Sequence, residues 1–339
     1  MLFRKEMFIV RKHKQGFSEN KNEIVACDKF NRAIAGAEND SEISYVPLPK
    51  THKTVVSSCI FQMDSSITVT YGVCLTQFDK SVEDAIYTLV DRTNASNSDD
   101  YTYTVRDVAK ILRQNDNKNI HIEFLQEISK SLYRLSNTYV KISCEKELAA
   151  RGIDKKIIKD FPNEEHLLVT SFRTDDTGHE TETVVNYPDM IQSFTLIKEP
   201  ILFRYAMLIK NFELIDGNIY RLPKKLKVTS IRIAVHSYLR DQIILMNRQT
   251  IAPIIRYNEL IPAVTGRENF SRTEKNRIHT NVKDILKQFS NEGILDPLQP
   301  YTEIVEKKGK TTTIVGMKIN ISGNYCNDTD SLNLEGEEF

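Results

Sequence analysis

The clearest hydrophobic pattern in the chain lies between residues 228 and 321, where apolar positions repeat at helical spacing. Ile231, Val235 and Leu239 predict a first helix over residues 228–246, with Thr229 or Ser230 as its N-cap. A short second helix is predicted over 254–261, bounded by proline on both sides. A third helix is predicted over 271–289, and Gly293 follows it as a stop signal.

The third helix has the strongest signals. Ser271 and Glu274 form the capping-box pattern S-x-x-E. One apolar stripe runs along its C-terminal half and consists of Ile278, Val282, Ile285, Leu286 and Phe289. The N-terminal half is polar and basic instead. Recognition helices dock with their N-terminal residues at base edges in the major groove, so this asymmetry favours a role in reading DNA.

Two alternating segments follow, over 301–306 and 311–321, and the residues between them are Lys307-Lys-Gly-Lys310. The pattern predicts a β-hairpin with a basic tip. A helix, a short helix, a third helix and then a hairpin is the order of a winged helix, a variant of the helix-turn-helix plan. The basic tip would lie on the flanking DNA backbone or in the minor groove.

An earlier stretch of the chain repeats this order. Helices are predicted over 75–90, 104–112 and 120–138, and a strand begins at 140–143. A larger hairpin is predicted from 166–172 to 180–185, followed by strand-like runs at 192–196 and 201–208. Residues 67–73 alternate like a strand. The predicted fold class is therefore α+β, with two tandem winged-helix domains.

This reading divides the chain into four parts. Residues 1–70 form an N-terminal extension without an assigned fold, and residues 71–220 form the first winged-helix domain. Residues 221–322 form the second, and residues 323–339 form an acidic tail that is expected to be disordered. At 339 residues, two domains with separate cores are the natural expectation.

Charge is distributed unequally between these parts. The whole chain has 46 basic and 46 acidic residues, yet residues 221–321 hold 18 Lys/Arg against 9 Asp/Glu. Residues 15–220 hold 23 Lys/Arg against 31 Asp/Glu. An asymmetry of this size indicates a polyanionic partner for the basic region.

The third helix and the hairpin tip of the basic region supply the candidate DNA-binding residues. Arginine suits guanine and asparagine suits adenine in the major groove, whereas hydroxyls and lysines suit phosphates. The candidate base contacts are Arg272, Asn276 and Arg277, with Lys275 on the same surface; the candidate phosphate contacts are Ser271, Thr273, Lys307, Lys308 and Lys310. The alternative is that these side chains merely form a solvated helix face.

The first domain leaves two interpretations open. Its third helix carries Lys130 and Arg134 on one side, which would suit a second DNA reader. The region as a whole is acidic, which favours protein contacts or dimerisation instead.

No pattern indicates catalysis. P-loop and dinucleotide-binding glycine motifs are absent, as is an H-x-H pair of the kind that metal-dependent nicking enzymes use. The five cysteines form no C-x-x-C and no zinc spacing. The sequence predicts a protein that is not an enzyme and has no cofactor or metal. Without a spanning segment or a signal-peptide core, a cytoplasmic location and no membrane partner are expected.

From about residue 69 to residue 321 the chain resembles plasmid replication initiator proteins with two tandem winged-helix domains. The likeness is carried by the order of elements and by short segments: Leu75-Thr-Gln-Phe-Asp79, Tyr238-Leu-Arg-Asp-Gln-Ile-Ile-Leu-Met246, Ile255-Arg-Tyr257, Lys283-Asp-Ile-Leu286 and Gly293-Ile294.

The resemblance implies that the protein binds direct repeats in double-stranded DNA at a replication origin and helps to melt adjacent A·T-rich DNA. It also implies recruitment of host replication proteins and a homodimer that represses its own gene. A winged-helix transcriptional regulator is the main alternative, and a partition-type adaptor that binds DNA without sequence preference is a third.

Overall fold

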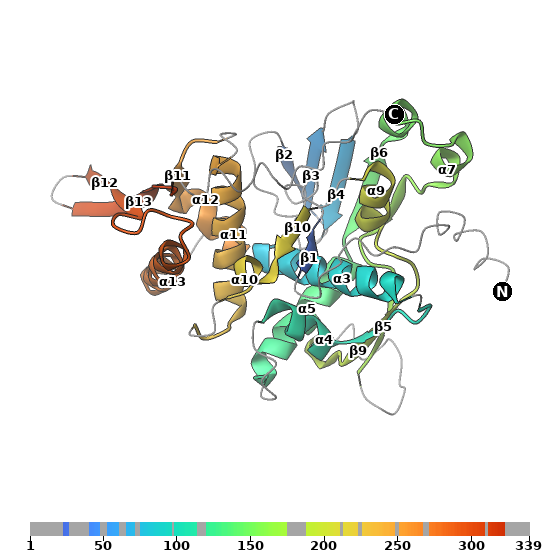
Figure 1. The fold of residues 1–339 in the computed structure, drawn as a ribbon, viewed down its shortest axis with the longest axis horizontal. Coiled ribbons are helices and arrows are strands. Elements are labelled where there is room, and N and C mark those ends of the chain that lie inside the picture. The colour runs from blue at the N-terminus through green and yellow to red at the C-terminus, as the bar shows by residue number, and fades with distance from the viewer. Residues whose placement is uncertain are drawn as a thin grey trace. The chain divides into compact units, whose positions relative to one another are not determined.

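The computed structural model describes residues 23–26, 41–47, 53–60, 66–71, 75–96, 98–113, 120–174, 188–210, 213–222, 226–247, 251–266, 271–308 and 311–322. The chain divides into two compact units, Met1–Ser230 and Ile231–Phe339. We call them the N-terminal unit and the C-terminal unit. The fold is α+β with small sheets, as predicted (Figure 1). The tail at 323–339 lies outside the described residues, as does most of the first 70.

Helices make up much of the described part of the N-terminal unit. They are α3 (Gln77–Ala95), α4 (Val105–Leu112), α5 (Ile122–Ser136), α6 (Glu145–Ala150), α7 (Lys155–Asp160), the 3-10 helix η3 (Pro188–Met190), α9 (Ile201–Ile209) and α10 (Gly217–Tyr220). Its strands are β1 (Glu23–Ala26), β2 (Ser41–Pro47), β3 (Lys53–Ile60), β4 (Ser66–Tyr71), β5 (Thr102–Thr104), β6 (Tyr139–Ser143), β7 (Glu164–His166), β8 (Thr170–Arg173), β9 (Ser193–Leu196) and β10 (Glu213–Asp216).

Three helices and a three-stranded sheet of this unit follow the order α3, β5, α4, α5, β8, β9. The strands pair antiparallel in the order β5-β9-β8. Capping boxes start two of the helices: Thr76 with Asp79 opens α3, and Thr104 with Asp107 opens α4. Both satisfy backbone N–H groups that a helix start leaves without partners, which explains why the helices begin there.

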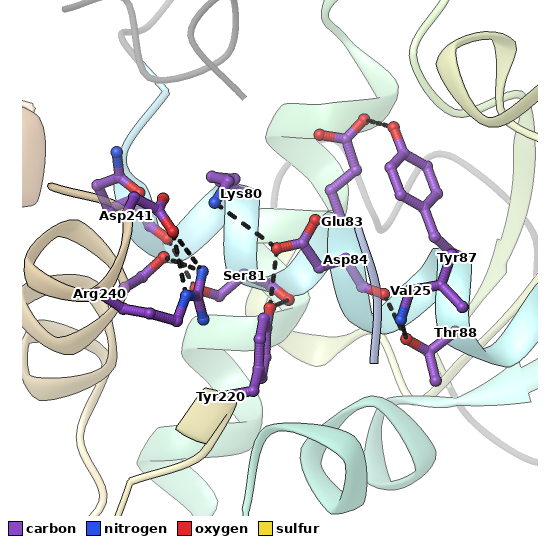
Figure 2. Close-up of polar contacts among 12 residues, drawn as sticks. Val25, Lys80, Ser81, Glu83, Asp84, Tyr87, Thr88, Tyr220, Arg240 and Asp241 are labelled. Carbon is purple, nitrogen blue, oxygen red and sulfur yellow. Dashed lines mark hydrogen bonds and ion pairs between the residues drawn. The ribbon is translucent and has the colours of Figure 1, made fainter. Parts of the chain in front are cut away.

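Two further sheets complete the N-terminal unit. Strands β2-β3-β4-β6-β7 form an antiparallel five-stranded sheet, and α6 and α7 are inserted between β6 and β7. Strands β1 and β10 pair antiparallel, and β1 packs on α3. The backbone N–H of Val25 donates to the Thr88 hydroxyl at 3.0 Å, which fixes β1 against the helix (Figure 2).

The C-terminal unit contains three helices and one three-stranded sheet. These elements are α11 (Ser230–Asn247), β11 (Ile254–Arg256), α12 (Tyr257–Thr265), α13 (Arg272–Asn291), β12 (Tyr301–Lys308) and β13 (Thr311–Ile319). The strands are antiparallel in the order β11-β13-β12. Gly316 makes this pairing possible, because a Cβ there would lie 2.4 Å from the carbonyl oxygen of Ile255.

Side chains from all three helices form the core of this unit. The predicted stripe of α13 is buried throughout, and Leu239, Ile243 and Leu260 from the other two helices are buried as well. A polar contact adds to the packing: Arg232 Nε on α11 donates to Asn281 Oδ1 on α13 at 2.9 Å. The N-terminal half of α13 is left outside this core.

Two predicted segments have a different secondary structure. Residues 201–208, predicted as a strand, belong to α9, because a short run of apolar residues buried on all sides has the same pattern in a helix as in a strand. Residues 254–256, predicted as helix, form β11, where two β-branched isoleucines pair with β13.

The hairpin predicted in the first domain, from 166–172 to 180–185, has a different strand pairing in the structure. Its first strand is present as β8, which pairs with β9, a segment that was predicted as a separate strand. The second hairpin strand, predicted at 180–185, lies outside the described residues. The strand predicted at 67–73 and the two hairpin strands predicted in the second domain are confirmed as β4, β12 and β13.

Candidate nucleic-acid interface

The N-terminal half of α13 is an uninterrupted polar surface. All seven residues from Ser271 to Arg277 are exposed, and burial begins at Ile278. The predicted capping box is present: Ser271 Oγ donates to Glu274 Oε2 at 2.8 Å and accepts from the Glu274 N–H at 3.2 Å. The Ser271 hydroxyl is therefore engaged by the helix itself, and a phosphate would have to share it.

Helical spacing orders these exposed side chains around α13. At 3.6 residues per turn, Thr273, Asn276 and Thr280 lie along the middle of the face opposite the buried stripe. Arg272 and Arg277 lie on either side of this row. Thr280 was not predicted as a site residue; its hydroxyl donates to the Asn276 carbonyl at 3.0 Å, and its place one turn beyond Asn276 could have been read from the spacing.

The hairpin of β12 and β13, which we call the wing, carries the other predicted contacts. Lys307 is exposed near the end of β12. Glu303, four residues before Lys307 on β12, contacts α13. A β-bulge between Ile304 and Val305 lies between the two residues. Lys310 and the side chain of Lys308 lie outside the described residues.

A chain of polar contacts connects α12, α13 and β12. Lys283 Nζ lies 2.6 Å from Glu303 Oε1, and His279 Nε2 lies 3.8 Å from the same oxygen. The Tyr257 hydroxyl hydrogen-bonds His279 Nδ1. Burial, and next the charge of Lys283, lowers the pKa of His279, which favours the neutral ring. Sequence patterns gave no sign of Glu303, because its partners come from another element.

The corresponding helix of the N-terminal unit has a different surface. At the start of α5, Ile122 is 63% exposed and is followed by the exposed Glu123. Lys130 Nζ pairs with Glu127 on the same helix at 3.1 Å. The first turns of α5 thus present apolar and acidic groups where α13 presents basic ones.

Arg134, the other predicted contact on α5, is an internal ion-pair partner. Its Nη2 lies 2.6 Å and its Nε 2.9 Å from Asp79 Oδ1, and Ser131 Oγ donates to the same oxygen at 2.7 Å. Asp79 is fully buried and also caps α3. The guanidinium therefore holds α5 against the start of α3.

Within the part of the chain that the structure describes, no group of three or more His, Cys, Asp or Glu side chains could hold a metal ion. None of the described helices is long and apolar enough to cross a membrane.

Comparisons with known proteins give a weak likeness. No protein-family model matches the chain, and no curated protein sequence matches it. A crystal structure of domains 2 and 3 of RctB is similar at 14% sequence identity and a TM-score of 0.41. A selenomethionine derivative of the same two domains is similar at 13% identity and a TM-score of 0.39. Both matches cover 88% of this chain and 98% of the other. A likeness this weak carries no argument about function.

Proposed function

We propose that the C-terminal unit is a winged-helix domain that binds double-stranded DNA, with α13 as its recognition helix. The observation that carries this proposal is the row of exposed residues from Ser271 to Arg277, which stands outside the core at the N-terminal end of α13. The order α11, β11, α12, α13, β12, β13 and the sheet order β11-β13-β12 support the same plan. Asn276 is the candidate for adenine, and Arg272 and Arg277 are the candidates for guanine.

We propose that the N-terminal unit contains a second winged-helix domain, which binds proteins and does not read DNA bases. Its elements α3, β5, α4, α5, β8 and β9 follow the same order, and its sheet order β5-β9-β8 corresponds. Lys130 and Arg134 are engaged within the unit, and Glu123 at the start of α5 would repel phosphates. These features favour protein contacts, including a homodimer or host replication proteins, over base reading.

For the whole chain we infer a replication initiator that acts by binding and does no chemistry of its own. The resemblance of short segments to plasmid replication initiators supports this role and implies repeated sites at an origin. A cytoplasmic location, which is part of this proposal, would give the protein access to such DNA. The alternative of a transcriptional regulator shares the same DNA-binding unit, so the arrangement of the bound sites decides between the two.

The test is to recover the DNA segments that the purified full-length chain protects from cleavage in fragments flanking its own gene. An initiator protects several direct repeats beside an A·T-rich segment. Protection of one palindrome at a promoter would favour the regulator. Protection without sequence preference would contradict both and favour an adaptor.

A further inference from the structure

The wing and the recognition helix are joined by the side chains of Tyr257, His279, Glu303 and Lys283, which we call the α12–α13–β12 contact chain. Glu303 on β12 is its centre, because Lys283 Nζ and His279 Nε2 on α13 both face its Oε1 atom. Tyr257, the first residue of α12, packs against His279 with ring centroids 5.3 Å apart and the ring planes tilted by 59°. Three elements thus meet in one polar contact.

The direction of the hydrogen bonds follows from the charge states. Burial, and next the charge of Glu303, raises the pKa of the Tyr257 hydroxyl, which therefore stays protonated and donates to His279 Nδ1. A neutral imidazole that accepts at Nδ1 carries its proton on Nε2. That proton faces Glu303 Oε1, so the carboxylate is approached by two donors from α13.

The position of this contact relates it to the proposed DNA surface. His279 follows the exposed row of α13 by less than one turn, and Glu303 precedes Lys307 by four residues on β12. Beyond the pairing of β11 with β13, the wing is a two-stranded hairpin, which has little support of its own in water, so its direction depends on what holds its base.

We propose that Glu303 and His279 are positioning residues that hold the wing at a fixed angle to α13, so that Lys307 and the recognition helix bind one DNA segment together. This inference rests on the proposed function. The side chains of Glu303 and Lys283 are about one-third exposed, at 32% and 39%. Ion pairs of that exposure contribute little to folding, so variants of them keep the fold while the angle is released.

The test compares Glu303→Gln with Glu306→Gln in the full-length chain, by anisotropy on the site that the wild type protects. Both substitutions remove one negative charge from β12, but Glu306 is exposed and is not a member of the contact chain. Phosphate repulsion alone predicts tighter binding for both. Positioning predicts weaker binding for Glu303→Gln, by about threefold or more, the size of coupling expected between residues in contact.

A double-mutant cycle measures how Glu303→Gln changes the effect of Lys307→Ala on DNA affinity. A purely structural role of Glu303 would leave that effect unchanged. Lys307→Ala should weaken binding in the wild-type background and have a smaller effect beside Glu303→Gln. The exchange Lys283→Glu with Glu303→Lys restores the pair with opposite polarity, and it should recover binding that each single change loses. Thermal unfolding of every variant checks that the fold is retained.

Two different results would contradict the positioning role and the proposed function. Equal effects of Glu303→Gln and Glu306→Gln, with an unchanged effect of Lys307→Ala, would overturn the positioning role and leave DNA binding intact. No DNA binding by the wild-type chain would overturn the proposed function and this inference with it.

Discussion

Arg277 is exposed at the edge of the polar face of α13, and a guanidinium can form two parallel hydrogen bonds with a guanine. We expect Arg277→Ala to cost roughly 1–3 kcal/mol of binding free energy on the specific site and much less on random DNA. Lys287→Ala is the matched control, because Lys287 is exposed on the same helix beyond the proposed interface. Equal weakening on both DNAs would remove Arg277 from the base contacts.

Lys307 is predicted to contact a phosphate and no base. Its replacement by alanine should weaken binding to specific and random DNA alike, because a phosphate contact carries no sequence information. The slope of log affinity against log salt should become shallower by about 1, since one fewer counterion is released. Titrations at several salt concentrations measure this slope, and an unchanged slope would exclude Lys307 from the interface.

At the scale of elements, Arg134 links α5 to the buried start of α3. Arg134→Met would leave Asp79 buried without its cation, a change that costs about 3–5 kcal/mol for a buried pair. We expect the low end of that range, because the Arg134 side chain is 26% exposed. Urea unfolding measures the loss, and Lys130→Met on the exposed side of α5 serves as control. If Arg134→Met weakened DNA binding and left the stability unchanged, Arg134 would be a DNA contact and not a structural ion-pair partner.

Glu83, another of the buried carboxyl groups of helix α3, affects the pH dependence of stability. Burial raises the pKa of Glu83 from 4.5 to about 8, against a weaker opposing effect of the hydrogen bond from Tyr87 (Figure 2). The folded state therefore prefers the protonated acid, whereas the unfolded chain ionises near pH 4.5. The contribution of Glu83 to stability is therefore greatest below that pH and is lost as the pH rises towards about 8.

Glu83→Gln tests this pH dependence. The fall that Glu83 causes, up to roughly 1.4 kcal/mol per pH unit, should disappear in the glutamine variant, which stays neutral. Unfolding free energies at pH 5, 6, 7 and 8 would be compared with the wild type. Parallel curves for the two proteins would mean that Glu83 is not protonated in the fold.

The helices that could be predicted are those with local signals. A capping box and a one-sided stripe predicted α13, and similar signals predicted α4, whereas an apolar stripe alone predicted α5. Helix α9 and strand β11 were missed, because their isoleucines and leucines are buried by neighbours that the local pattern does not reveal. The pairing of β8 with β9 could not be predicted either, because it joins segments that are separated along the chain.

At the scale of the whole molecule, the basic surplus of residues 221–321 and the acidic surplus of residues 15–220 are properties of composition, and the sequence is sufficient to find them. The exposed row on α13 could also be predicted, because its residues are neighbours along one helix. The partners of Arg134 and Glu303 could not. An ion pair with Asp79 or Lys283 depends on how separate elements pack.

The recognition role of α13 is tested most directly by the ratio of two affinities of the full-length chain, one for the protected fragment and one for random DNA. Both affinities would be measured by anisotropy at several salt concentrations. We expect a ratio on the order of 10³ or more, typical of specific DNA-binding proteins. Affinity for both DNAs should fall steeply with salt, because phosphate contacts release counterions. A ratio near one, or binding that survives the loss of Arg272, Asn276 and Arg277 together, would contradict a recognition role for α13.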